Sequence, residues 1–172
     1  MADTPNMDAL WNNYPHTTLI TFGEDVGLPV GQMGNSEVGH MNIGAGRVIF
    51  QELARINKEI REDKVRHQPE VINLLNYCKD HHKPLHIMVL ASDGGVHSHI
   101  DHLNAFTHVL TEMGIEEGYV HAFTDGRDTG PTSGIHFIEE VINFTSDTSF
   151  RLASLIGRYY SMDRDHRWER IK

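Results

Sequence analysis

The sequence has little cysteine, little positive charge and no long apolar run. Its 172 residues contain one cysteine, Cys78, so no disulfide framework is expected and a reducing compartment fits. Fifteen Lys and Arg against 24 Asp and Glu give a net charge of −9, which argues against a protein that coats nucleic acid. Apolar runs reach only about seven residues, far short of the ~20 that cross a bilayer.

The first ten residues, MADTPNMDAL, lack the basic and apolar regions of a secretory signal. We therefore expect a cytoplasmic protein without membrane or nucleic-acid partners. A chain of this length buries about 70% of its unfolded surface, so its core needs no disulfide or metal to form. Composition thus indicates an acidic globular protein and leaves its chemistry open.

Helices and strands alternate along the later part of the chain. Strands are predicted where β-branched and apolar residues form short runs, at residues 17–22, 85–91, 119–123 and 150–156. Helices are predicted from apolar spacing and proline signals at residues 5–13, 48–60, 69–83, 100–113 and 132–144. Because apolar strands separated by helices form βαβ units, we predict an α/β fold with a parallel sheet and helices on both faces.

Glycine is crowded into residues 23–46, which indicates a backbone that turns tightly or approaches another group closely. The regular alternation begins only after this segment. We therefore predict a boundary near residue 50, with one domain at residues 1–50 and another at residues 51–172.

Polar loops follow the last three predicted strands, at residues 92–99, 125–130 and 157–165. In an open parallel sheet, ligands bind outside the carboxyl ends of the strands, so these loops predict a site. Residues 158–172 hold five basic and three acidic residues, although the whole chain is acidic. Because arginine matches carboxylate and phosphate oxygens two at a time, we expect an anionic ligand, with Arg158 as a leading candidate.

Two other patterns leave alternatives open. His97, His99, Asp101 and His102 form an HxHxDH run, which dinuclear zinc hydrolases place after a strand. Ser36 is either a helix N-cap or a nucleophile at a helix N-terminus, where backbone N–H groups favour phosphate. A further alternative for the whole protein is a non-catalytic module that binds phosphate or carboxylate.

Four segments together resemble the cofactor-independent phosphoglycerate mutases. They are GQMGNSEVGHMNIGAGR (31–47), SDGGVHSHIDH (92–102), HAFTDGRDTGP (121–131) and GRYYSMDRDHRWERI (157–171). The resemblance runs in order along essentially the whole chain. It implies an incomplete alkaline-phosphatase-like domain at residues 1–50 and a partial phosphotransferase domain at residues 51–172. The implied activity interconverts 3-phosphoglycerate and 2-phosphoglycerate through a phosphoserine in glycolysis and gluconeogenesis.

The resemblance also implies roles for individual residues. Ser36 matches the nucleophilic serine, which is also a manganese ligand, and Asp128 matches the general acid/base. The residues that match substrate-binding positions are His97, Arg127, Asp128, Arg158 and Arg164. Two Mn²⁺ ions, no requirement for 2,3-bisphosphoglycerate, a phosphoglycerate substrate and a monomeric parent enzyme are implied as well.

The sequence also departs from the family pattern. In the family, a strand with a metal-binding aspartate precedes the segment that begins at Thr4, and several hundred residues follow Lys172. We therefore expect an internal piece of the enzyme that is inactive alone, marginally stable and prone to associate through uncovered strand edges. His166 stands where lysine is usual, on a face expected to be solvated.

Overall fold

The computed structural model describes residues 3–170, and the chain divides into one compact unit that ends at Arg55 and one that begins at Ile56. The division falls inside helix α3 (Glu52–Arg61). The domain assignments made from the sequence stay predictions. Ile171, the last residue of the fourth motif, and Lys172 lie outside the described residues. None of the helices in residues 3–170 has both the length and the apolar character needed to cross a membrane.

The first unit contains helix α1 (Pro5–Asn13), the 3-10 helix η1 (Gly23–Val26) and helix α2 (Ser36–Ala45). The strand predicted at residues 17–22 is wrong. Only Phe22 pairs there, through an isolated antiparallel bridge to Met33. β-branched residues favour a strand when a neighbouring strand accepts their backbone hydrogen bonds. The described part of this unit offers no such neighbour to residues 17–21.

Gly27 shows why this part of the chain needs glycine. Its φ is 85°, and a Cβ there would lie 2.1 Å from the carbonyl oxygen of Ile49. The Gly27 oxygen accepts a hydrogen bond of 2.8 Å from the backbone N–H of Gln51. The Asn42 side chain adds a second tie, because it donates to the Val26 oxygen and accepts from the Ile49 N–H. Hydrogen bonds therefore hold the glycine-rich loop against the segment before α3.

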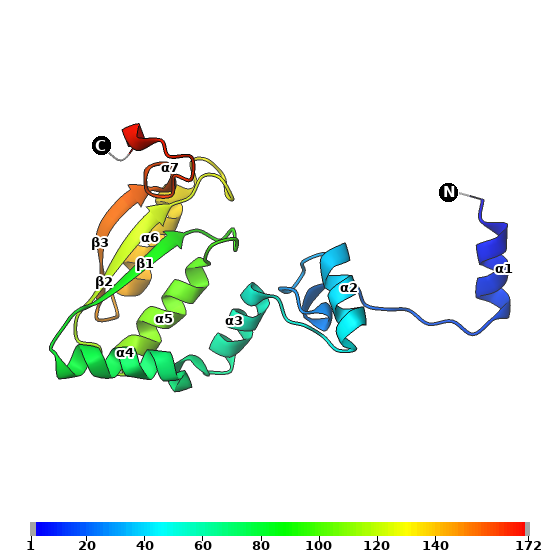
Figure 1. The fold of residues 1–172 in the computed structure, drawn as a ribbon, viewed down its shortest axis with the longest axis horizontal. Helices are drawn as coiled ribbons and strands as arrows, with labels where there is room; N and C mark the ends of the chain where they lie inside the picture. Colours follow the sequence, from blue (N-terminus) through cyan, green and yellow to red (C-terminus); the bar gives the residue numbers. More distant parts are fainter. Residues whose placement is uncertain (1–2, 171–172) are drawn as a thin grey trace. The chain divides into compact units, whose positions relative to one another are not determined.

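The second unit contains the remaining elements, which match the predicted alternation closely. They are η2 (Val65–His67), α4 (Pro69–Asp80), β1 (Leu85–Ala91), α5 (Ile100–Glu112), β2 (Gly118–Thr124), α6 (Gly134–Thr145), β3 (Phe150–Gly157), α7 (Arg158–Ser161) and η3 (Trp168–Arg170). The strands pair in parallel in the order β1-β2-β3 (Figure 1). The α/β class and the parallel sheet are confirmed.

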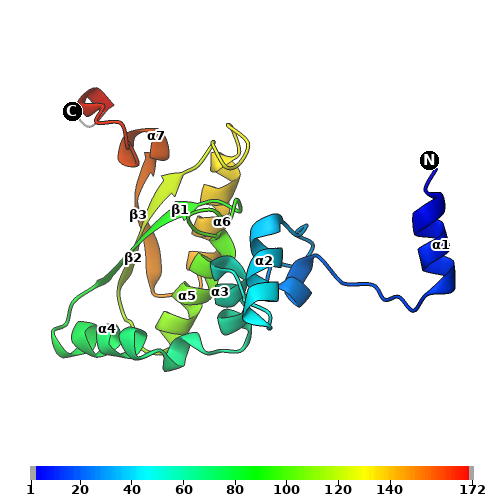
Figure 2. The same cartoon turned by 45° about the vertical axis from the view of Figure 1, so that its right-hand side comes forward.

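Helices α5 and α6 pack on the same face of the sheet (Figure 2). The core on that face combines Leu103 of α5 and Val141 of α6 with Val120 and Ala122 of the central strand. On the opposite face, His86 and Met88 are exposed. For the described residues, the prediction of helices on both faces is therefore wrong. Crossovers between parallel strands are right-handed, so strands that follow one another in spatial order place both helices on one side.

Candidate functional site

The three predicted loops meet at the carboxyl ends of the strands. They surround a pocket of about 700 Å³ that reaches into the segment after α7. Its lining comprises Val96, His97, Asp125, Gly126, Arg127, Asp128, Arg158, Tyr159, Met162, Asp163, Arg164, Asp165 and Arg170. The prediction that these loops converge is confirmed, because parallel strands end at a common edge and each loop begins there.

Arg158 joins the loops at the centre of this pocket. It is the first residue of α7, directly after β3, and its side chain is only 11% exposed. Its Nη1 donates to Asp125 Oδ1 and to Asp128 Oδ2, each at 2.7 Å. Its Nη2 lies 3.1 Å from His97 Nε2. Because arginine can only donate, His97 accepts here through an unprotonated Nε2.

Asp125 is the most deeply buried carboxylate of the site, with 1% of its side chain exposed. Its Oδ2 accepts from the Ser92 hydroxyl at 2.7 Å, and its Oδ1 accepts from the backbone N–H groups of Arg127 and Asp128. Burial works to raise the pKa of Asp125. The hydrogen bonds, from Ser92 first and then from Asp128 and Arg158, outweigh it and hold that pKa at about 2.

Asp125 and Ser92 were missed in the sequence analysis, although a signal for them exists. Each is the first residue after a strand, and Asp125 opens an Asp-Gly-Arg-Asp turn. An aspartate that begins a turn commonly accepts from N–H groups two or three residues on, as Asp125 does. The sequence predicts a polar loop at residues 125–130, and the structure adds that the Asp125 carboxylate organises it.

Two arginines of the pocket remain open to a ligand. Arg127 and Arg164 are exposed, and neither guanidinium pairs with a carboxylate of residues 3–170. Arg170 is already engaged, because it donates to Asp163 and lies 3.9 Å above the Tyr159 ring. The pocket therefore combines two engaged arginines, Arg158 and Arg170, with two free ones. The structure brings His97, Arg127, Asp128, Arg158 and Arg164 around the same pocket, as the sequence analysis predicted.

Ser36 lies in the first unit, at the start of α2, where it is exposed. The interpretation of Ser36 as the N-cap is wrong, since the cap is Asn35, whose Oδ1 accepts from Val38 N at 3.0 Å. His40 Nδ1 lies 3.2 Å from Ser36 Oγ and 2.7 Å from the Ser36 carbonyl oxygen. A carbonyl only accepts, so Nδ1 carries a proton and cannot take the one on the serine hydroxyl. Ser36 therefore lies at a helix N-terminus, but His40 cannot act as the base that removes the proton of its hydroxyl.

The described residues do not build a metal centre at Ser36. Nowhere in residues 3–170 do three or more His, Cys, Asp or Glu side chains gather in a way that could hold a metal ion. A single hydroxyl is far fewer ligands than a manganese site requires. The residues present therefore do not fit the two Mn²⁺ ions that the resemblance implied, and no chemical step is derived through them.

The HxHxDH run is divided among different surroundings. His97 faces Arg158, whereas His99 Nδ1 accepts from the Asp101 N–H at the start of α5. His102 Nε2 lies 2.5 Å from Asn57 Oδ1, so this nitrogen donates and offers no lone pair to a metal. Burial lowers the pKa of His102. This arrangement does not support the zinc hydrolase alternative.

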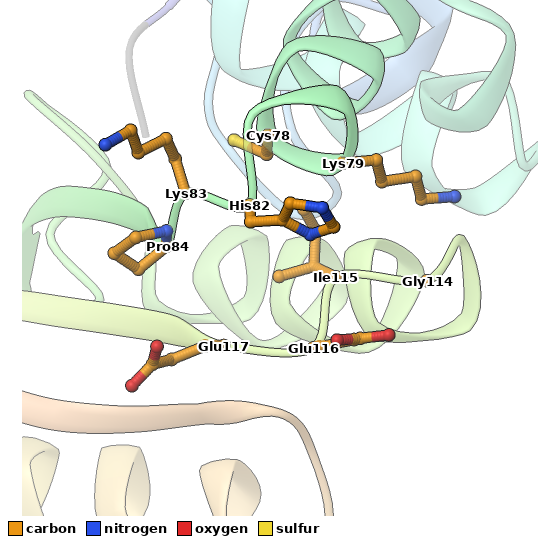
Figure 3. A pocket seen from close by; sticks show the side chains of 9 residues that line it. All are labelled: Cys78, Lys79, His82, Lys83, Pro84, Gly114, Ile115, Glu116 and Glu117. Atoms are coloured by element: carbon orange, nitrogen blue, oxygen red, sulfur yellow. The ribbon is translucent and has the colours of Figure 1, made fainter.

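A second pocket, of about 420 Å³, lies at the amino ends of β1 and β2 (Figure 3). Its cationic side chains do not converge, because Lys79 and Lys83 point in opposite directions. Lys79 Nζ instead donates to the Met113 carbonyl oxygen at 2.6 Å. This end of the sheet therefore lacks the focused charge found around Arg158.

Comparison with known proteins agrees with the geometry. The family model described as BPG-independent PGAM N-terminus matches residues 56–172, which correspond to the second unit. The chain is 53% identical over 169 residues to the 2,3-bisphosphoglycerate-independent phosphoglycerate mutase of Parabacteroides distasonis, covering 98% of this chain and 33% of that protein. The enzyme of the same name from Clostridium perfringens is 51% identical over 172 residues, covering 99% of this chain and 34% of that protein.

A solved structure shows the same likeness in three dimensions. A phosphoglycerate mutase of Leishmania mexicana, crystallised at low cobalt concentration, superposes with a TM-score of 0.72 at 33% identity. The match covers 99% of this chain and 33% of that one. The chain thus spans about a third of the length of the relatives it matches. On its sequence, its fold and the loops that surround Arg158, the chain belongs to the 2,3-bisphosphoglycerate-independent phosphoglycerate mutase family.

Proposed function

We propose that the pocket around Arg158 binds phosphoglycerate and that the parent enzyme interconverts 3-phosphoglycerate and 2-phosphoglycerate through a phosphoserine at Ser36. The observation that carries the proposal is the pocket itself. It places one buried, fixed arginine beside two arginines with free guanidinium groups. A ligand with both a carboxylate and a phosphate has two anionic ends for such donors.

In the proposed reaction, Ser36 Oγ attacks phosphorus and the bond from phosphorus to the glycerate O3 breaks. The leaving oxygen takes a proton and the serine hydroxyl loses one. Asp128, 19% exposed and beside Arg158, is the proposed acid/base at the glycerate hydroxyls. O2 then loses its proton and attacks the phosphoserine, the bond from phosphorus to Oγ breaks, and Oγ regains a proton. The guanidinium groups hold the glycerate between the two transfers, so no free second phosphate donor is needed.

The proposal includes manganese as the metal, a monomeric parent enzyme and a cytoplasmic location. No step is derived through the metal, because the described residues do not by themselves form its site. His40 does not activate the serine hydroxyl, because its Nδ1 donates to the Ser36 carbonyl oxygen. From the 172 residues alone with Mn²⁺, we expect no turnover of 3-phosphoglycerate.

Titration of the chain with 3-phosphoglycerate by calorimetry tests the binding part of the proposal. We expect Arg127→Ala and Arg164→Ala each to weaken binding by about tenfold, since each removes a charge-assisted contact. Arg151→Ala is the matched control, because it removes a positive charge from the sheet, where Arg151 pairs with Glu117. Equal binding by all four proteins would refute the assignment of the pocket.

A chimera tests the role of Ser36. Residues 1–172 replace the matching third of the Parabacteroides distasonis enzyme, and turnover and phosphoenzyme are measured with labelled 3-phosphoglycerate. We expect an active chimera whose turnover and label are both lost on Ser36→Ala. If label and turnover survive that change, Ser36 is not the nucleophile. If the unaltered chimera binds 3-phosphoglycerate but forms no label, the non-catalytic anion-binding alternative is favoured.

A further inference from the structure

Three groups touch the Arg158 guanidinium, and they differ strongly in burial. The Asp125 side chain is 1% exposed, that of Asp128 is 19% exposed and that of His97 is 42% exposed. A ligand that enters the pocket therefore reaches His97 and Asp128 before Asp125.

The three groups also differ in how they are held. Asp125 accepts hydrogen bonds from Ser92, from two backbone N–H groups and from Arg158, so both of its oxygens are occupied. Ser92 is itself buried, and its Oγ accepts from the Gly94 N–H at 3.0 Å. The side chain of Asp128, in contrast, has its one hydrogen bond in the described structure to Arg158. Asp125 cannot leave Arg158 without abandoning three other partners.

We propose that Ser92 and Asp125 are a positioning pair. They hold the Arg158 guanidinium in place while Asp128 and His97 exchange their contacts with it for contacts with the ligand. This inference rests on the proposed function, because it assigns the phosphoglycerate pocket a permanent anchor and two replaceable partners. Asp125 touches no substrate in this role and acts through Arg158.

The Ser92–Asp125 link also joins two loops. Ser92 directly follows β1 and Asp125 directly follows β2, and Asp125 holds Arg158, which directly follows β3. The junction leaves little room for an extra side-chain atom at Gly94. A Cβ on Gly94 would lie 3.0 Å from the Asp128 Cβ and 3.2 Å from Ser92 Oγ. Through Asp125, which lines the pocket, the pair therefore links all three loops.

The two aspartates give opposite predictions for neutral replacements. Asp125→Asn keeps the shape but weakens the anchor, so we expect 3-phosphoglycerate to bind at least tenfold more weakly. Asp128→Asn removes a replaceable competitor for Arg158, so binding becomes several-fold tighter. If Asp125 acted only as a negative charge near an anionic ligand, its neutralisation would tighten binding instead. The sign of the change thus separates positioning from simple electrostatics.

The experiment combines calorimetry with NMR of the Arg158 side chain in the full 172-residue chain. We expect sharp Arg158 guanidinium signals in the unaltered chain and in Asp128→Asn, and exchange-broadened signals in Asp125→Asn. Asp147→Asn, an exposed aspartate away from the pocket, is the charge-matched control and should change neither measurement. Ser92→Ala is the milder second variant, expected to weaken binding about threefold and to broaden the same signals.

The outcomes are distinguishable. If the unaltered chain does not bind 3-phosphoglycerate, the proposed function fails, while the Arg158 signals still test the anchor. Unchanged Arg158 signals in Asp125→Asn, or tighter binding by that variant, overturn the positioning role. Should Asp125→Asn not fold, a folded Ser92→Ala with unaltered binding and unaltered Arg158 signals overturns it equally.

Discussion

Arg158 shows how one side chain can organise a site. Its guanidinium offers donors in a fixed plane, and this plane matches two carboxylates at 2.7 Å and an imidazole nitrogen at 3.1 Å. Lysine could not make the same set of contacts, because its ammonium is a point charge without the planar fork. An arginine at position 158 therefore links all three loops.

Removal of the Arg158 charge should destabilise the second unit. In Arg158→Met, Asp125 stays buried without its cation, and we expect the free energy of unfolding to fall by about 3 kcal/mol. Adding Asp125→Asn to the Arg158→Met variant should recover part of the lost stability. Urea unfolding followed by circular dichroism measures both. Arg151→Met, whose exposed pair with Glu117 contributes little, should cost less than about 1 kcal/mol. A similar loss in the two single variants would contradict the buried pairing.

The low pKa of Asp125 predicts a specific acid sensitivity. Its pKa of about 2 lies below the ordinary value of 3.8, so the folded state binds this proton less readily than the unfolded state. The resulting stability is fully present above about pH 4 and is lost as the pH falls toward 2, a change of about 2 kcal/mol. Unfolding measured over this range should show a shallower pH dependence in Asp125→Asn. An identical slope in both proteins would exclude the assigned pKa.

At the scale of elements, the ends of helices and strands carry the chemistry. The three loops gain their positions because β1, β2 and β3 are parallel and end at one edge. Helix α2 presents Ser36 in the same way, since a capped N-terminus leaves backbone donors and a positive dipole end beside the hydroxyl. Regular structure therefore supplies position, and the adjoining residues supply reactivity.

The cap of α2 is testable by one substitution. Asn35→Ala removes the oxygen that accepts from Val38 N, and we expect the first unit to lose about 1 kcal/mol of stability. Asn35→Asp should keep the cap. Amide hydrogen exchange at the start of α2 measures the change. Protection that is the same in Asn35→Ala and in the unaltered chain would show that another group caps this helix.

At the scale of the whole molecule, the main feature is a sheet whose two faces are covered to different extents. One face carries α5 and α6, while the other shows Met88 at 76% exposure beside polar side chains. β1 and β3 are the two edges, and Leu155 and Ile156 are exposed on β3. Unpaired edges with apolar side chains favour association between chains.

The 172-residue chain should therefore associate as its concentration rises. Sedimentation velocity over a wide concentration range measures this, and Leu155→Lys should reduce the association because a charge on an edge strand opposes pairing. Ile135→Lys, at an exposed position on α6, is the control and should leave the association unaltered. A chain that sediments as a monomer throughout would contradict the prediction.

Local sequence determined the elements of the second unit well. Apolar runs and helical spacing placed all three strands and the helices between them, because side-chain periodicity reports directly on burial. It failed at residues 17–22, where the pattern suits a strand but no neighbouring strand is present in the described residues. The four motifs also indicated the family, since long strings of specific residues carry far more information than composition.

Tertiary structure alone decided what the side chains of the pocket do. The sequence predicted that Arg158 and Asp128 belong to one site. The positions of Ser92 and Asp125 directly after strands placed both near that site, but did not show that they bond to each other and that Asp125 holds Arg158. The sequence likewise did not show which face of the sheet the helices cover, because that depends on strand order. The physical reason is the same in both cases. Hydrogen bonds between residues 33 positions apart exist only after separate strands have been brought side by side.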